Sequence, residues 1–243
     1  MRTIVLHSFT WIILTAFSLL ATGIGLSPSS YIGSLVKIPQ PAHFDSKRAA
    51  VLLRQVESEL GSEQYHLVQR YANEYGLDYR LILAIIKQES QFNSEATSER
   101  GAVGLMQLMP LTNDEVSENL QMGEIDMIHS NIRGGIYYFA KLMTLFQPTN
   151  MDDRVRLALA AYNAGPARIY DAQELAAYIG DNPNSWASIQ NVLPLLSKRF
   201  SSLHQSIWQD PKPRSGYFGS WRQTVGYVDS TMKVYNEYLQ AES

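Results

Sequence analysis

The sequence contains no cysteine, which excludes disulfides, thiolate metal ligands and cysteine nucleophiles. It also lacks an excess of positive charge, since 20 basic and 23 acidic residues give a formal net charge of −3, and this balance argues against a nucleic-acid partner. The histidines nowhere fall at the spacing of metal ligands, so we expect surface or partly buried residues at His7, His43, His66, His129 and His204. The remaining composition, with 45% hydrophobic residues, is that of an ordinary globular protein.

The first residues have the layout of an export signal. No acidic or basic residue occurs from Thr3 to Val36, and Arg2 precedes the apolar run Phe9–Leu26. This order of charge and apolar run is typical of a secretory signal, and the positive-inside rule places the rest of the chain outside. The run has about the length that spans a bilayer. We therefore expect export across the inner membrane to the periplasm or cell envelope, with residues 1–26 as a cleaved signal peptide or a retained anchor.

A mainly α domain is expected after this segment. Residues 27–44 are rich in proline and serine, which is typical of a linker, and residues 45–243 have a size that suits a single domain. Past residue 45, apolar residues recur at helical spacing, whereas alternating strand patterns are scarce. The predicted helices cover residues 50–60, 62–75, 79–89, 136–146, 155–162, 174–179, 186–207 with a break near Pro194, and 221–239.

Glu89 ends the third of these helices, for which Asp78 is the expected N-cap. Residues Leu81–Ile86 are all apolar, so we expect this helix to be buried on every side. Glu89 follows Ile85 by four residues and therefore shares its buried face. Burial and the negative end of the helix dipole both disfavour a carboxylate, which predicts a raised pKa and a general acid near neutral pH. This segment alone leaves open that Glu89 is a surface residue ending a helix.

Several blocks around this acid occur in a recognisable order. They are E-S-Q-F-N at 89–93, A-T-S at 96–98, G-A-V-G-L-M-Q-L-M-P at 101–110 and A-Y-N-A-G-P at 161–166. Together they resemble the family 1 lytic transglycosylases, whose soluble-lytic-transglycosylase domain has a lysozyme-like, goose-type fold. The resemblance runs from about residue 65 to the C-terminus. Its closing part, W-R-Q-T-V-G-Y-V at 221–228, looks most like the catalytic domain of the membrane-bound transglycosylase F type. That type carries a solute-binding-like domain ahead of the catalytic one, which we do not expect in this chain.

The resemblance implies a role for each block. Glu89 would be the only catalytic acid and base, and it would first protonate the glycosidic oxygen. It would then take the proton of the C6 hydroxyl on the same N-acetylmuramyl residue, which releases a 1,6-anhydro sugar without water. The implied substrate-binding residues are Ser98, Gly104, Met106, Gln107, Tyr162, Asn163 and Tyr227. Among them, Met106 would be an apolar floor, Gln107 and Asn163 amide partners, and Tyr227 a neighbour of the acid. The sequence departs from the commoner family pattern at Gln223, where that pattern has glutamate.

The predicted function is that of a peptidoglycan lytic transglycosylase. Its partner would be the glycan strand of murein, cut at the β-1,4 bond between MurNAc and GlcNAc, and no metal or organic cofactor is implied. Two alternatives stay open. A lysozyme-type hydrolase would use the same glutamate with an activated water and would leave reducing ends. A weakly catalytic, glycan-binding component of an envelope-spanning machine would bind without turnover.

Overall fold

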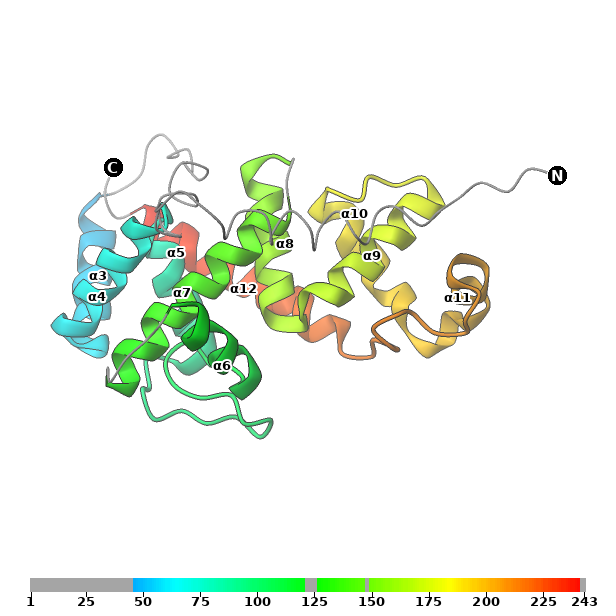
Figure 1. Ribbon diagram of the computed structural model, residues 1–243. Helices are drawn as coiled ribbons and strands as arrows, with labels where there is room; N and C mark the ends of the chain where they lie inside the picture. The colour runs from blue at the N-terminus through cyan, green and yellow to red at the C-terminus, as the bar shows by residue number, and fades with distance from the viewer. Residues whose placement is uncertain (1–45, 121–125, 147–148, 241–243) are drawn as a thin grey trace, which may run out of the picture.

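The computed structural model describes residues 46–120, 126–146 and 149–240, and within these ranges the chain is built from helices (Figure 1). The longer ones are α3 (Ser46–Leu60), α4 (Ser62–Glu74), α5 (Tyr79–Ser90), α6 (Pro110–Asn119), α7 (Met127–Leu145), α8 (Met151–Ala164), α9 (Pro166–Ile179) and α12 (Trp221–Leu239). The shorter ones are α10 (Trp186–Val192), η1 (Leu193–Leu196), η2 (Lys198–Phe200) and α11 (Ser201–Trp208). The described ranges hold no β-strand, and isolated bridges join Val103 to Thr97 and to Leu108. The predicted mainly α fold is confirmed.

The helices are arranged along an extended body. In Figure 1, α3, α4, α5 and α7 gather at one end, α9, α10 and α11 lie at the other, and α12 runs between the two. No helix of the described ranges combines the length and the apolar character needed to cross a membrane. The predicted signal or anchor at 1–26 and the linker at 27–44 lie outside the described residues.

Several predicted helix ends are confirmed by their capping residues. Gly61 separates α3 from α4 and has a φ of +92°, which favours glycine. The side chain of Asp78 accepts a hydrogen bond of 2.9 Å from the backbone N–H of Arg80 and so caps α5. The break near Pro194 is the boundary between α10 and η1, and α12 has the bounds that its apolar spacing predicts.

Other predicted ends are wrong, each for a local reason. Helices α7 and α8 begin at Met127 and Met151, ahead of the predicted starts at residues 136 and 155. Their first turns are fixed by the N-caps Asp126 and Asn150, which accept backbone hydrogen bonds of 3.0 and 2.9 Å, rather than by apolar spacing.

Two further differences concern α9 and α6. Helix α9 begins at Pro166, ahead of the predicted start at residue 174. The fixed φ of proline and its missing N–H suit the first position of a helix. Helix α6 was not predicted. Its only buried residue is Val116, so it carries no apolar stripe that a pattern could reveal.

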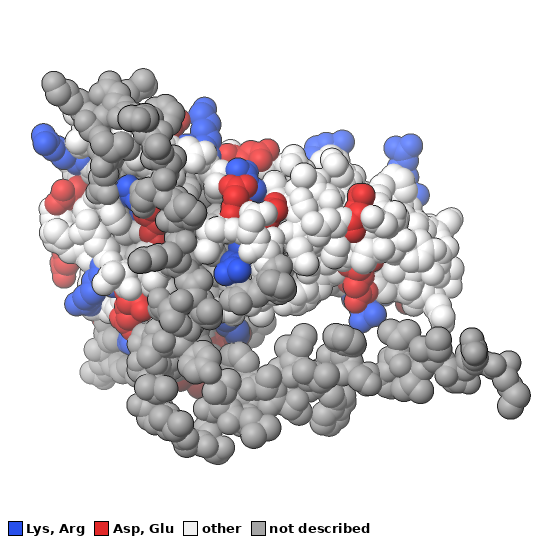
Figure 2. Space-filling model, turned by 90° about the horizontal axis from the view of Figure 1, so that it is seen from above, with Lys and Arg blue, Asp and Glu red and all other residues white. Residues whose placement is uncertain are grey.

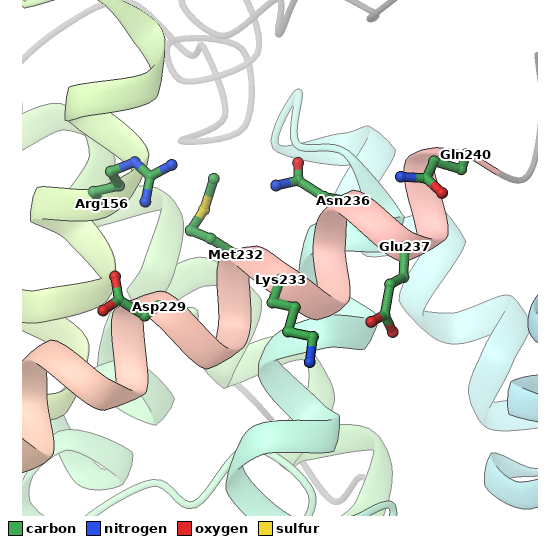
Figure 3. A pocket seen from close by; sticks show the side chains of 7 residues that line it. All are labelled: Arg156, Asp229, Met232, Lys233, Asn236, Glu237 and Gln240. Carbon is green, nitrogen blue, oxygen red and sulfur yellow. The ribbon is translucent and has the colours of Figure 1, made fainter. Parts of the chain in front are cut away.

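The surface of the described residues is mixed in charge. Figure 2 shows lysine and arginine side chains interspersed with aspartate and glutamate over one face. A pocket of about 380 Å³ lies on this body between α8 and α12, lined by Arg156 and by α12 side chains from Asp229 to Gln240 (Figure 3). None of the predicted site residues lines this pocket.

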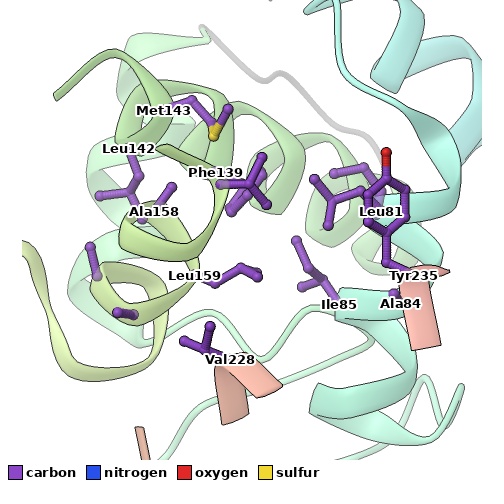
Figure 4. Packing of buried hydrophobic residues seen from close by; sticks show 14 of the residues in the cluster. Leu81, Ala84, Ile85, Phe139, Leu142, Met143, Ala158, Leu159, Val228 and Tyr235 are labelled. Carbon is purple, nitrogen blue, oxygen red and sulfur yellow. The ribbon is translucent and has the colours of Figure 1, made fainter. Parts of the chain in front are cut away.

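Helix α5 lies at the centre of the core. Leu81–Ile86 have no exposed surface at all, so the predicted burial on every side is confirmed. Helix α12 packs along α5 and also contacts α8, which in turn packs on α7. Figure 4 shows Ile85 of α5, Phe139 of α7, Leu159 of α8 and Val228 of α12 converging on one apolar cluster. Glu89 therefore leaves this core at the end of its most buried helix.

A buried ion pair fixes α12 against the start of α5. Asp78 Oδ2 lies 2.7 Å from Arg80 Nη2, and the two side chains are 7% and 5% exposed. The same oxygen accepts a hydrogen bond of 3.1 Å from the hydroxyl of Tyr235 on α12. Asp78 thus acts at once as helix cap, buried counter-ion and acceptor for the last helix.

Replacing Asp78 by alanine should therefore cost far more than the loss of an ordinary cap. Asp78→Ala removes a buried carboxylate 2.7 Å from the buried Arg80 guanidinium, and we expect a loss of about 3 kcal/mol in the free energy of unfolding, measured in urea. The matched control Asn150→Ala removes an exposed cap from α8 and should cost about 1 kcal/mol. Equal losses in the two variants would contradict the role given to the buried pair.

Candidate active site

Glu89 lies in the last turn of α5, and the chain leaves that helix through an unusual turn. Helix α5 ends at Ser90, and the next two residues, Gln91 and Phe92, have φ values of 50° and 64°. Non-glycine residues in this left-handed region cost about 1 kcal/mol or more each. This turn leads directly into the loop that joins α5 to α6.

The carboxyl of Glu89 is held by one strong donor in a poorly hydrated place. The hydroxyl of Tyr227 on α12 donates a hydrogen bond of 2.7 Å to Glu89 Oε1. Burial raises the pKa of Glu89 from 4.5 to about 7, and the bond from Tyr227 opposes part of this rise. The direction is the one expected from the sequence. At neutral pH, a substantial fraction of Glu89 therefore carries a proton.

Tyr162, near the end of α8, is the second phenol of the site. Its hydroxyl donates a hydrogen bond of 2.7 Å to the backbone oxygen of Met106. Burial and the charge of Glu89 raise the pKa of both Tyr162 and Tyr227 well above the usual value. Both phenols are thus neutral donors at any working pH, and the structure brings Glu89, Tyr162 and Tyr227 together from three helices.

The loop between α5 and α6 uses two of the predicted site residues for its own shape. Ser98 Oγ accepts a hydrogen bond of 2.9 Å from the backbone N–H of Ala102. Gln107 Nε2 donates bonds of 2.9 Å to the backbone oxygens of Ala96 and Gly104. The nitrogen of Gln107 is therefore engaged within the loop, and its carbonyl Oε1 is the end left to meet a ligand.

Gly104 and Met106 serve close packing beneath the same loop. Gly104 has a φ of +79°, and a Cβ atom there would lie 2.6 Å from the side chain of Asn131. The Met106 side chain has no exposed surface and packs against Gly135, where a Cβ would meet it at 2.5 Å. The Met106 side chain is thus part of the core in this structure, where α7 covers it, and its role as an apolar floor for substrate stays a prediction. Its backbone, by contrast, faces Tyr162.

Asn163 lies beside Tyr162 and is exposed at the end of α8. Its Oδ1 accepts a hydrogen bond of 2.8 Å from the hydroxyl of Thr224, one turn before Tyr227 on α12. This bond commits the carbonyl end of the amide, so Nδ2 is the end left as a donor. Gln223, where the family pattern has glutamate, is exposed on α12 and forms no part of this contact.

Sequence reasoning missed two residues of this site. Thr224 orients Asn163, and Asn131 of α7 joins the loop to the helices by accepting from Met106 N–H at 2.8 Å and donating to Val103 O at 2.9 Å. Asn131 is 7% exposed within an otherwise apolar face of α7. An asparagine among the apolar residues of a helix face indicates a buried amide, but the sequence does not show which backbone groups that amide binds.

The histidines and carboxylates of the described ranges form no group of three or more that could hold a metal ion. The expectation of a surface or partly buried histidine is wrong at His204, which has no exposed surface. Its ring nitrogens lie 2.7 Å from Leu195 O and 3.2 Å from Pro211 O. A neutral ring donates its one N–H to one of these carbonyls, which gives this buried histidine a hydrogen-bond partner.

The sequence is similar to a known protein family and to several of its members. Residues 66–182 match the family model described as the transglycosylase SLT domain. The chain is 42% identical over 137 residues to a membrane-bound lytic murein transglycosylase F of Desulfosudis oleivorans, which covers 55% of this chain and 29% of that protein. It is 34% identical over 202 residues to a protein of the same description from Shewanella sediminis, with 82% and 38% covered. The chain thus spans about a third of the length of these relatives.

A solved structure is also similar. It is an inactive glutamate-to-glutamine mutant of the lytic transglycosylase Slt from Pseudomonas aeruginosa, with a TM-score of 0.52 and 27% sequence identity. The match covers 77% of this chain and 26% of that one.

The raised pKa of Glu89 predicts a pH-dependent cost in stability. The unfolded chain ionises this group near pH 4.5 and the folded chain near pH 7, so stability falls as pH rises through this window. We expect Glu89→Gln to be more stable than the wild type above pH 7, by up to about 3 kcal/mol. Below about pH 4.5 the difference should vanish, as urea unfolding at several pH values would measure.

The control for this experiment is Glu95→Gln, which removes an exposed carboxylate from the loop that follows α5. If the two variants gained the same stability between pH 4.5 and 7, the burial of Glu89 would not be the cause.

Proposed function

Since this chain belongs through residues 66–182 to the lytic transglycosylases of the SLT type, we propose that it cleaves the β-1,4 bond between MurNAc and GlcNAc in peptidoglycan and leaves a 1,6-anhydro end. The names of the relatives from Desulfosudis oleivorans and Shewanella sediminis support murein as the substrate. The lysozyme-like fold predicted from the sequence is confirmed by the structural likeness to the Pseudomonas aeruginosa protein.

The observation that carries this proposal is the state of Glu89. Its pKa of about 7 lets one carboxyl be a proton donor in one step and a proton acceptor in the next. Most hydrolytic glycosidases use a pair of carboxyl groups flanking the bond. The other carboxylates near Glu89 in the sequence, Glu95, Glu99 and Asp114, are exposed to solvent. A reaction that needs a single buried carboxyl therefore suits this site best.

The proposed reaction uses the two oxygens of Glu89 differently. Oε1 accepts from Tyr227 throughout, while the proton on Oε2 passes to the glycosidic oxygen as the bond from C1 to that oxygen breaks. The C6 hydroxyl of the same sugar then attacks C1, and its proton returns to Oε2. Because the attacking hydroxyl is tethered, its effective concentration is high and no activated water is needed. Glu89 ends the cycle protonated, as it began.

The remaining predicted residues would position the sugar. Asn163 has its Nδ2 left as a donor, and it suits an acceptor such as the carbonyl oxygen of an acetamido group. Gln107 has only its Oε1 left and suits a hydroxyl or amide N–H. Ser98 and Gly104 would act mainly by fixing the loop that carries Gln107.

The proposed place of action is the cell envelope. The relatives carry the description membrane-bound, and murein as the substrate agrees with export of this chain. Residues 1–26 as a signal peptide or anchor, residues 27–44 as a linker and residues 45–243 as the catalytic domain remain predictions from the sequence.

Glu89→Gln should abolish cleavage while it keeps glycan binding. Glutamine preserves the shape of the side chain and can still accept from Tyr227, but it carries no transferable proton. We expect at least about a 100-fold loss of soluble product from purified murein, with binding to insoluble murein retained, and Glu95→Gln as the control at wild-type activity. Mass spectrometry of the wild-type digest should show anhydro ends.

Two results would overturn the proposal. Reducing ends without anhydro sugar would identify a hydrolase of the lysozyme type. Binding of murein by the wild-type protein without any turnover would identify a glycan-binding component of a larger machine.

Tyr227→Phe should move the activity profile along the pH axis. The bond from Tyr227 favours the carboxylate form, so its loss raises the pKa of Glu89 above about 7. The protonated acid then persists to higher pH, and the alkaline limb of the rate profile should shift upward. Tyr217→Phe, which removes an exposed hydroxyl bonded to Pro211 O, is the control. A shift toward lower pH would contradict this role of Tyr227.

A further inference from the structure

We propose that Asn131 of α7 is a positioning residue for this site, which fixes the Tyr162 hydroxyl beside Glu89 by holding the backbone of Met106. This inference rests on the proposed function, because it concerns the same carboxyl. It adds a residue outside the sequence blocks that suggested the site.

Asn131 attaches the loop between α5 and α6 to the helical body. Its Oδ1 accepts from Met106 N–H at 2.8 Å and its Nδ2 donates to Val103 O at 2.9 Å. The bonds of Ser98 and Gln107, by contrast, stay within the loop. Asn131 is 7% exposed, so both backbone partners lose a bond that water replaces poorly if the amide is removed.

The loop is shaped around this amide. A Cβ atom at Gly104 would lie between 2.6 and 2.8 Å from Nδ2, Oδ1 and Cγ of Asn131. Only glycine leaves room for the amide here, and the φ of +79° at Gly104 also favours glycine. Gly104, assigned to substrate approach from the sequence, has this second and more local use.

The backbone of Met106 links Asn131 to Tyr162 through two hydrogen bonds. Its N–H is held by Asn131, and its C=O accepts the Tyr162 hydroxyl at 2.7 Å. The single hydroxyl proton of Tyr162 is thereby committed to the loop. The phenol oxygen can then only accept on its other side, from protonated Glu89 or from a hydroxyl or amide N–H of the sugar.

Two phenols lie near the carboxyl, and a third packs against one of them. Tyr227 of α12 donates a hydrogen bond to Glu89, and the charge of Glu89 raises the pKa of Tyr162 of α8. The ring of Tyr138 of α7 packs at a tilted angle against that of Tyr162, with centroids 5.6 Å apart. With the loop released, water would reach Glu89 and remove part of the burial that raises its pKa. Asn131 therefore acts on Glu89 without touching it.

The test compares Asn131→Ala with Asp171→Ala, which removes a buried helical side chain of α9 that holds a different loop. Asp171 is 3% exposed and accepts from Ser215 N–H at 2.8 Å, so its loss also frees a loop. For both variants, the titration of Glu89 is followed by carboxyl NMR and the rate on murein is followed across pH. We expect only Asn131→Ala to lower the pKa of Glu89, by about one unit, with a tenfold loss of rate above pH 7.

A double-mutant cycle tests whether Asn131 acts through Tyr162. In a Tyr162→Phe background, Asn131→Ala should lower the pKa of Glu89 by much less than it does alone. Full additivity, an unchanged titration in Asn131→Ala, or an equal shift in Asp171→Ala would each overturn the proposal. If Asn131→Ala does not fold, Gly104→Ala serves instead, since its Cβ must displace the amide, and it should lower the same pKa.

The two proposals fail in different ways. If the wild-type protein does not cut murein, the proposed function is wrong, whereas the titration of Glu89 needs no substrate and still decides the role of Asn131.

Discussion

The burial of one carboxyl, with one donor to hold it, is the constraint on which the site depends. Glu89 must be dry enough to keep a proton near pH 7 and open enough to give it away. Helix α5 meets the first need because it is buried from Arg80 to Ile86, just ahead of Glu89. Helix α12 meets the second, because the Tyr227 bond keeps the carboxylate form accessible. The packing of α12 on α5 is therefore part of the chemistry as much as of the fold.

The loop between α5 and α6 is held by hydrogen bonds within it as well as by those from Asn131 of α7. It opens on two residues in the left-handed region, Gln91 and Phe92, and contains a third at Gln107. Its polar side chains form hydrogen bonds with the backbone of the same loop, as Ser98 does with Ala102 N–H. A loop held in this way presents a fixed arrangement of backbone and amide groups, which reduces the conformational entropy that the loop itself would lose when a ligand binds. The backbone strain at Gln91 and Phe92 thus accompanies a loop whose conformation is already fixed before a ligand binds.

The sequence predicts the parts of this structure that depend on local pattern. Asp78, the buried run of α5 and the bounds of α12 follow from capping residues and apolar spacing. The place of Glu89 after that run suggests a raised pKa but leaves its role open, and the family resemblance is what singles it out as the acid. Helix α6 could not be found in this way because it buries one side chain. The roles of Asn131 and Thr224 depend on contacts with residues 25 and 61 positions away, and no local pattern encodes them. Met106 illustrates the same limit, since only the structure shows that α7 covers its side chain.

The span between the acid and its donor has a consequence for how the site is assembled. Glu89 and Tyr227 are 138 positions apart, and Tyr235 on the same last helix joins α12 to Asp78 at the start of α5. The bond between Glu89 and Tyr227 therefore forms only when α12 docks on α5. The electrostatic environment of the carboxyl is thus set by tertiary packing and not by the local sequence around Glu89.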